Sequence, residues 1–167
     1  MLDTTMFFTI LIGVLIAGLA GWLIFLQRKV QASEKSASNQ HSGLQLQAYE
    51  RLTVLADRIA LPNLISRSNI PGMGAREMQE LLIKQIREEF EYNISQQIYV
   101  SPEAWKTLKN LKDQNLLIVN QIARSLPENA TGLDLNKSIL QLLMNDTKAD
   151  IHMLVSEALS YEAKKLM

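Results

Sequence analysis

The sequence contains no cysteine among its 167 residues. This absence excludes disulfide bonds, thiolate metal sites, a cysteine nucleophile and lipoprotein-type acylation. The chain also has no net charge, because 17 basic residues balance 17 acidic ones. From Leu44 onward there are 14 basic and 15 acidic residues. Binding to nucleic acid depends on an excess of basic residues, so we expect no nucleic-acid partner.

Motifs for nucleotide or phosphate binding are missing as well. The segment Pro71-Gly72-Met73-Gly74 has two glycines, but it has neither the spacing GxGxxG nor the Gly-Lys-Ser/Thr of a phosphate loop. We interpret it as a turn. The sequence therefore predicts no cofactor and no small-molecule substrate.

Three side chains are the visible candidates for chemistry, namely Glu88, Glu91 and His152. Di-iron bundles use Glu-x-x-His pairs on facing helices, and no histidine accompanies the two glutamates. Four-residue charge pairs such as Lys84–Glu88 on a solvated helix face explain the glutamates better. His152 has no triad or metal partner set by spacing. We predict no catalytic residue and no metal site, and an enzyme with an unrecognised site is the remaining alternative.

One long hydrophobic run is present, from Met6 to Leu26, and it carries no charge. At 1.5 Å per residue these residues form a helix of about 31 Å, which matches a hydrocarbon core of about 30 Å. A cleaved signal peptide needs a positive leader and a shorter run, whereas Asp3 is the only charge before this one. We predict a short tail over residues 1–5 and a retained transmembrane helix over residues 6–26.

Basic residues next to the predicted span set its orientation. Arg28 and Lys29 follow the span and no basic residue precedes it. Lys and Arg stay on the cytoplasmic side during insertion. We therefore expect the N-terminus outside and the rest of the chain in the cytoplasm.

Small residues recur within the span at Gly13, Ala17 and Gly21, four positions apart on one helix face. Such a face lets another transmembrane helix approach closely, either from a second copy or from a different membrane protein. Glycine and alanine are also common in membrane spans generally. The pattern leaves both interpretations open.

Residues 27–43 form a polar linker with the sequence QRKVQASEKSASNQHSG. It is rich in Ser, Gln, Asn and Ala and poor in large apolar residues. We favour a disordered or frayed tether here. The alternative is a helix that continues out of the membrane, because Gln, Ala, Glu and Lys tolerate helix well.

Residues 44–167 have helical periodicity throughout and predict one all-α domain of about five helices, arranged as a helical hairpin or small bundle. Residues 63–74 are expected to connect the first two helices. Ser101 and Asp146 are the predicted caps of the third and fifth. The expected helices cover residues 44–60, 75 onward, 102–126, 133–144 and 147–165.

The segment EFEYNISQQIYV (residues 89–100) mixes aromatic and aliphatic residues with amides. Tyr92, Gln96 and Tyr99 are candidates for a contact surface, since aromatic residues are enriched at interfaces. The apolar side chains of Phe90, Ile94 and Ile98 are expected in the core.

Two segments carry a resemblance to known proteins: LQAYERLTVLADRIALPNLISR (residues 46–67) and GAREMQELLIKQIREEFEYNISQQIYVSPEAW (residues 74–105). They resemble an uncharacterised family of small single-span proteins from bacteroidete bacteria. The resemblance implies a bacterial inner-membrane protein with an N-terminal anchor and a helical soluble domain. It brings no activity, cofactor or catalytic residue.

These observations favour a non-catalytic scaffold or accessory subunit that holds a helical domain at the cytoplasmic face of the inner membrane. Its expected partners are the lipid bilayer and another membrane protein. The alternative is a membrane-bound homo-oligomer that associates through the Gly13/Ala17/Gly21 face.

Overall fold

The computed structural model describes the backbone of residues 4–145 and 151–166, and the side chains of residues 11, 13–31, 40–145 and 151–166. All regular elements in these ranges are helices, so the predicted all-α class is confirmed. Part of the predicted N-terminal tail, the predicted cap Asp146 and the expected start of the last helix at Thr147 lie outside the described residues. The described helices are α1 (Thr4–Ile59), α2 (Leu61–Ser68), α3 (Ala75–Tyr92), η1 (Ile94–Ile98), α4 (Pro102–Ser125), α5 (Gly132–Asn145) and α6 (His152–Lys164).

The chain divides into two units, Met1–Gly43 and Leu44–Met167. The first unit consists of the N-terminal part of α1, and residues 28–43 are helical rather than disordered. Within it the stretch Gly13–Gln31 is long and apolar enough to cross a membrane, and none of it is buried. A Cβ atom added at Gly13 or Gly21 would meet nothing within 4 Å, so the chain's own packing does not require these glycines.

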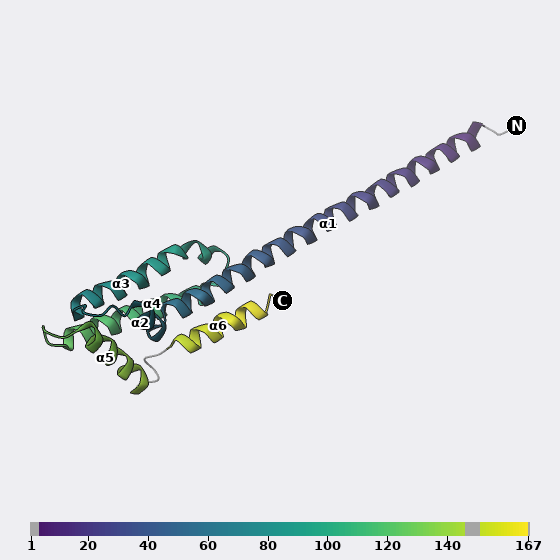
Figure 1. The fold of residues 1–167 in the computed structure, drawn as a ribbon. Helices are drawn as coiled ribbons and strands as arrows, with labels where there is room; N and C mark the ends of the chain where they lie inside the picture. The colour runs from purple at the N-terminus through teal and green to yellow at the C-terminus, as the bar shows by residue number, and fades with distance from the viewer. Residues whose placement is uncertain (1–3, 146–150, 167) are drawn as a thin grey trace. The chain divides into compact units, whose positions relative to one another are not determined.

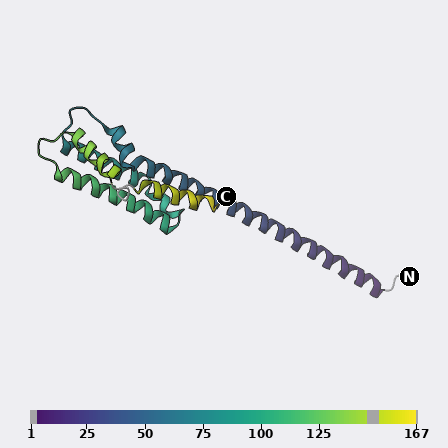
Figure 2. The same cartoon turned by 90° about the horizontal axis from the view of Figure 1, so that it is seen from below.

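The second unit is a helical bundle with two hydrophobic clusters, and α3 and α4 run through both of them. These two helices lie side by side in Figures 1 and 2. We call the first cluster the α2–α5 cluster, because α2 and α5 complete it around the start of α3 and the end of α4. Its largest fully buried side chains are Leu61, Leu64, Met78, Leu82, Ile86, Leu135 and Ile139.

The second, or α1–α6, cluster lies around the end of α3 and the start of α4. The domain part of α1 and helix α6 complete it, and Figure 2 shows α6 alongside α1. The predicted apolar spacing of α1 is confirmed from Ala48 to Ile59, whereas Leu44 is exposed. The buried members of the α1–α6 cluster include Tyr49, Leu52, Leu55, Ile59, Phe90, Leu108, Leu111, Val155 and Leu159.

A sharp break separates α1 from α2 at Ala60, whose φ and ψ are −55° and 124°. Pro62 has no amide hydrogen, so the Arg58 carbonyl lacks its helical donor. The Arg67 guanidinium donates to that carbonyl at 2.6 Å, and the buried Asn115 amide donates to the Ile59 carbonyl at 2.7 Å. Side chains thus satisfy carbonyls at the end of α1, which allows the chain to turn inside the core.

The predicted starts of α3 and α4 are confirmed. Glu77 accepts a hydrogen bond from the Gly74 amide at 3.1 Å in the first turn of α3. Ser101 caps α4 by accepting from the Ala104 amide at 3.2 Å. These caps satisfy backbone groups that a helix end leaves free, so they fix where both helices begin.

Two expectations for the domain are wrong. Residues 63–68 are expected in a connection but belong to α2, which buries Leu64 and Ile65 in the α2–α5 cluster. Ile94 and Ile98 are expected in the core but are 49% and 71% exposed. Both lie in the short helix η1, which turns away from the apolar stripe of α3.

Candidate functional site

An open groove of about 790 Å³ lies between α1 and α3. We call it the α1–α3 groove. Val54 is an exposed apolar residue on its wall, and Tyr92, one of the predicted contact residues, is 80% exposed at its edge. The groove is lined by Gln47, Glu50, Arg51, Val54, Leu55, Arg58, Glu88, Glu89, Tyr92 and Asn93.

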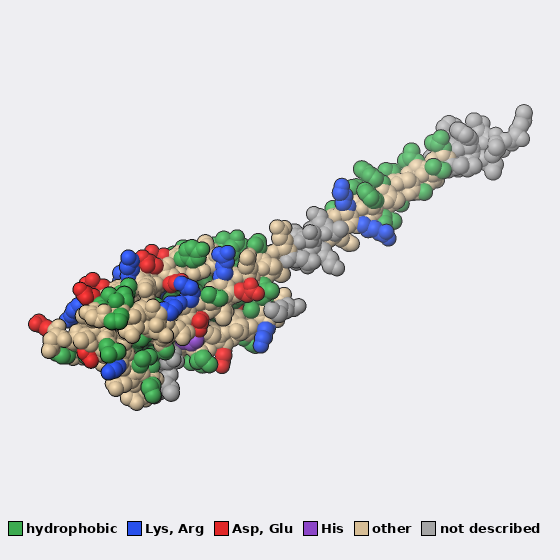
Figure 3. Space-filling view, viewed as in Figure 1, with side chains coloured by type: hydrophobic (Ala, Val, Ile, Leu, Met, Phe, Trp, Pro, Cys, Tyr) green, Lys and Arg blue, Asp and Glu red, His purple; other side chains and the backbone are tan. Residues whose placement is uncertain are grey.

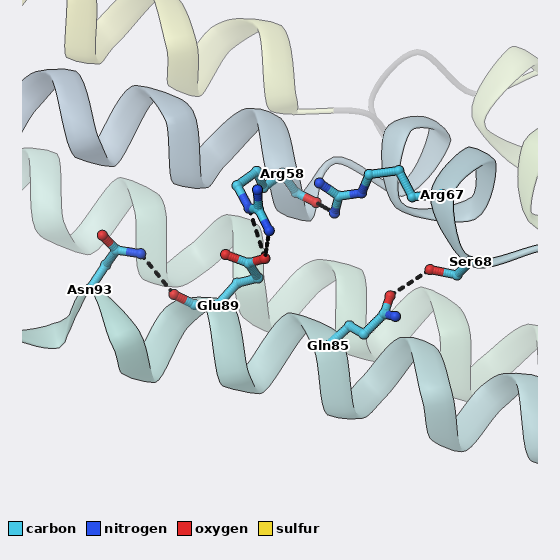
Figure 4. A network of polar contacts seen from close by, with 6 residues as sticks. All are labelled: Arg58, Arg67, Ser68, Gln85, Glu89 and Asn93. Carbon is cyan, nitrogen blue, oxygen red and sulfur yellow. Dashed lines mark hydrogen bonds and ion pairs between the residues drawn. The ribbon is translucent and has the colours of Figure 1, made fainter.

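An ion pair between Arg58 of α1 and Glu89 of α3 joins the two walls (Figure 4). Arg58 donates from Nε to the Glu89 carboxylate at 2.7 Å and also from Nη2. This hydrogen bond, together with the negative charge of Glu89, raises the pKa of Arg58 above its ordinary value. Because the arginine side chain is half exposed, the pair contributes at most about 1 kcal/mol to stability.

Polar contacts continue on both sides of this ion pair (Figure 4). Asn93, which is buried, donates to the Glu89 carbonyl at 2.9 Å and so closes the last turn of α3. Ser68 at the end of α2 donates to the side chain of Gln85. The first bond stabilises the end of α3, and the second connects α3 to α2.

A second groove of about 380 Å³ lies on the other side of α1, against α6. Its wall is mainly apolar and includes Leu46, Tyr49 and Ala163. Glu50 and Val54 line both grooves, so they form an exposed ridge between them. Two grooves on one helix can accept side chains of a polypeptide that lies across α1.

Two of the three carboxylates that line the α1–α3 groove are engaged by cations of the same chain. Glu89 pairs with Arg58, and Glu88 lies 3.7 Å from the Lys84 ammonium, as the predicted four-residue spacing indicated. Among the described residues no group of three or more His, Cys, Asp or Glu is placed to hold a metal ion. The groove offers mixed charge and apolar surface, which suits contact with a protein segment better than acid–base chemistry.

The three predicted chemical candidates lie in different surroundings. Glu88 is on the groove wall, and the described lining includes neither Glu91 nor His152. His152 begins α6, where its Nε2 atom lies 3.8 Å from the Asp57 carboxylate and 3.3 Å from the Ser156 hydroxyl. The contact with Asp57 connects the start of α6 to the end of α1.

Of the three predicted contact residues, Gln96 lies within η1, and Tyr92 and Tyr99 lie on either side of it. Tyr92 lines the groove, whereas Gln96 and Tyr99 are half-buried further along the chain. Sequence reasoning did not find the Arg58–Glu89 pair. The two residues are 31 positions apart, and no pattern in either helix indicates their pairing.

Comparison with known proteins identifies a family. The profile of a family of unknown function, DUF7935, matches residues 3–166. The chain belongs to this family. No curated protein and no solved structure matches the chain. The match covers both units of the chain.

Proposed function

We propose that the chain is a single-pass protein of the bacterial inner membrane, with its N-terminus outside and residues 44–167 in the cytoplasm. The helical domain would act as a scaffold or accessory subunit without chemistry of its own. The observation that carries this proposal is the stretch Gly13–Gln31, which is long and apolar enough to span a membrane and entirely exposed. Exposed apolar surface costs about 25 cal/mol per Å² in water, and a bilayer removes that cost.

The basic pair Arg28–Lys29 supports the orientation, because basic residues remain on the cytoplasmic side. Anchoring would confine the α1–α3 groove to a thin layer beside the membrane. Confinement raises the effective concentration of the groove toward any partner in the same membrane. The mechanism is therefore tethering.

The two tryptophans provide a direct test of anchoring, since Trp22 lies in the apolar helix and Trp105 in the domain. In liposomes with brominated lipids, the variant Trp105→Phe should show strong quenching of the remaining Trp22. The matched variant Trp22→Phe should show little quenching of Trp105. Equal, weak quenching in both variants would contradict membrane insertion.

Orientation is tested with a single cysteine, because the natural chain has none. Asn129→Cys introduces a thiol in the exposed turn before α5. We expect a membrane-impermeant maleimide to label it only after the inner membrane is permeabilised. Labelling in intact spheroplasts would show that the domain faces outward.

Docking of a partner at α1 is tested by crosslinking in native membranes followed by purification. Val54→Arg should reduce recovery of a stoichiometric partner, because Val54 is exposed and lines both grooves. Ile70→Arg is the matched control, since Ile70 is similarly exposed but lies in the connection after α2. A chain that is recovered alone would count against the scaffold role.

A self-associating homo-oligomer is the second candidate. It is favoured by the open space around Gly13 and Gly21, where nothing in the chain packs. Small residues allow two membrane helices to approach closely. Replacing both glycines by Ile should then reduce oligomer size in mild detergent, and an unchanged size would exclude this face.

A further inference from the structure

A pocket of about 260 Å³ lies between the end of α2 and the first half of α5. We call it the α2–α5 pocket. In Figure 3 hydrophobic side chains and a basic side chain are visible where α5 forms the lower edge of the domain. All lining residues belong to the unit Leu44–Met167, so the pocket is complete within the helical domain. It is lined by Ile65, Ser66, Asn69, Leu133, Asn136, Lys137 and Leu140.

One residue of this lining carries a buried amide without a hydrogen bond. Asn136 is 3% exposed, and neither its Nδ2 nor its Oδ1 atom has a partner among the described residues. Burial removes the bonds that such an amide makes to water, so an unpaired one lowers stability. Native proteins pair most of their buried polar groups, and exceptions concentrate where a residue serves a purpose other than stability.

The chemistry of the amide defines the group that it would pair with. An asparagine side chain presents donors on its nitrogen and an acceptor on its oxygen, next to each other. A secondary amide offers the complementary acceptor and donor side by side. The Asn136 amide lies beneath the pocket surface, so a ligand reaches it when an exposed lining side chain such as Leu133 turns aside. Exposed side chains change rotamer within nanoseconds, so this step is fast.

The charge of the pocket favours an anion. Lys137 is exposed, and the described lining includes no Asp or Glu. Glutamate lines both the α1–α3 groove and the groove against α6, so neither of them has this preference. Asp134, one turn before Lys137, is engaged by the Thr131 hydroxyl and amide. The Lys137 ammonium therefore favours a carboxylate in the α2–α5 pocket.

Size and apolar surface narrow the ligand further. Drug-sized ligands occupy pockets of about 300–1,000 Å³, so a pocket of about 260 Å³ suits a smaller molecule. Ile65, Leu133 and Leu140 supply an apolar wall for a branched alkyl group. An N-acylated apolar amino acid combines such an alkyl group with a secondary amide and a carboxylate.

We propose that the α2–α5 pocket binds an N-acylated apolar amino acid with a free carboxylate. Asn136 donates to the amide carbonyl of the ligand and accepts from its N–H, while Lys137 pairs with the carboxylate. The last residue of a polypeptide carries the same groups, so a free small molecule and a chain end are two sources of one chemistry. This binding site goes beyond the scaffold role proposed above and does not depend on it.

Ligand-detected NMR with the detergent-solubilised full chain tests the proposal, with N-acetylleucine as the probe. We expect saturable binding. N-acetylleucine amide lacks the carboxylate and 4-methylpentanoate lacks the amide, so each should bind several-fold more weakly. Absence of saturable N-acetylleucine binding in the millimolar range would overturn the proposal, and so would equal binding of the three probes.

Variants of the two polar residues locate the binding. Asn136→Leu and Lys137→Gln should each lower the affinity for N-acetylleucine several-fold. Lys109→Gln is the matched control for the charge, since Lys109 is exposed on α4 and should leave the affinity unchanged. N-acetylleucine should raise the Tm of the natural chain more than that of either pocket variant. Unchanged affinity in Asn136→Leu or in Lys137→Gln would overturn the assignment.

Short peptides distinguish the two sources of the ligand. A tetrapeptide that ends in leucine with a free carboxylate should bind more tightly than its C-terminal amide. Tighter binding of this tetrapeptide than of N-acetylleucine would assign the pocket to a chain end, and weaker binding would assign it to a free small molecule. Equal binding of the acid and amide forms would contradict the role of Lys137.

Discussion

At the scale of single residues, two buried asparagines have opposite energetic roles. Asn115 on α4 donates to the Ile59 carbonyl at 2.7 Å and so satisfies a backbone group at the break between α1 and α2. Asn136 on α5 is equally buried, but neither its amide nitrogen nor its oxygen has a partner in the described structure. A buried amide without a partner costs about 1–3 kcal/mol, whereas a paired one is neutral or stabilising.

Leucine at these two positions should therefore change stability in opposite directions. Asn115→Leu leaves the Ile59 carbonyl without a donor and should lower the free energy of unfolding by about 1–3 kcal/mol. Asn136→Leu removes an unsatisfied amide and should be neutral or stabilising by up to about 2 kcal/mol. Urea unfolding of the detergent-solubilised chain measures both. A large loss of stability in Asn136→Leu would show that the amide is engaged.

Asp134 makes a pH-dependent contribution at the start of α5. Its carboxylate accepts from the Thr131 hydroxyl at 2.7 Å and from the Thr131 amide at 2.9 Å. These bonds hold the pKa of Asp134 below its ordinary value. As the pH falls, the unfolded chain therefore binds a proton first, so the contribution is present above about pH 4 and is lost as the pH falls through the folded-state pKa.

The variant Asp134→Asn isolates this effect. The natural chain should be more stable than the variant at neutral pH, and the difference should shrink as the pH falls below about 4. Parallel thermal unfolding curves of the two proteins across this range measure it. A difference that does not depend on pH would show that the cap works without the carboxylate charge.

At the scale of elements, the starts of α3 and α5 lie against each other. The Ala75 amide donates to the Ala130 carbonyl at 3.0 Å, and the Gly132 amide donates to the Met73 carbonyl at 2.8 Å. A Cβ atom at Gly132 would lie 3.1 Å from both the Met73 carbonyl oxygen and the Met78 Cβ. These distances are shorter than most contacts of a Cβ atom, so a side chain at this position requires its neighbours to shift.

Gly132→Ala should consequently destabilise the domain by about 1–3 kcal/mol, because the added methyl overpacks the junction. Gly43→Ala is the matched control, since its Cβ would meet nothing within 4 Å and alanine favours helix. Chemical unfolding of both variants measures the difference. Equal stability of the two would show that α3 and α5 separate easily.

The elements that are predictable from sequence are those with local signals. Ser101 and Glu77 mark helix starts through bonds to residues three positions away, and such bonds are visible in sequence. Helix α2 was not predicted, because Pro62 interrupts the apolar pattern of α1 and indicates the end of a helix. Proline is equally compatible with the first turn of a new helix, which is where Pro62 lies. The groove depends on pairing of α1 with α3, and residues far apart in the chain give no periodic signal for such pairing.

At the scale of the whole domain, α3 and α4 connect the two hydrophobic clusters. The apolar stripe of α3 buries Leu82 in the α2–α5 cluster and Phe90 in the α1–α6 cluster. Helix α4 likewise buries Val119 in the α2–α5 cluster and Leu108 in the α1–α6 cluster. Opening either cluster exposes one side of both central helices, so the two clusters are expected to unfold together.

Truncations at the two ends of the domain test this coupling. Leu52→Ala removes a fully buried side chain from the α1–α6 cluster, and Leu135→Ala does the same in the α2–α5 cluster. Each should lower the free energy of unfolding by about 2–5 kcal/mol through the cavity it leaves. Hydrogen exchange should then accelerate by the same factor in α2 and α6 in either variant, because protection in both follows global unfolding. Faster exchange in α6 alone for Leu52→Ala, with α2 unchanged, would show that the α1–α6 cluster opens independently, and the α1–α3 groove would then belong to the less stable part of the domain.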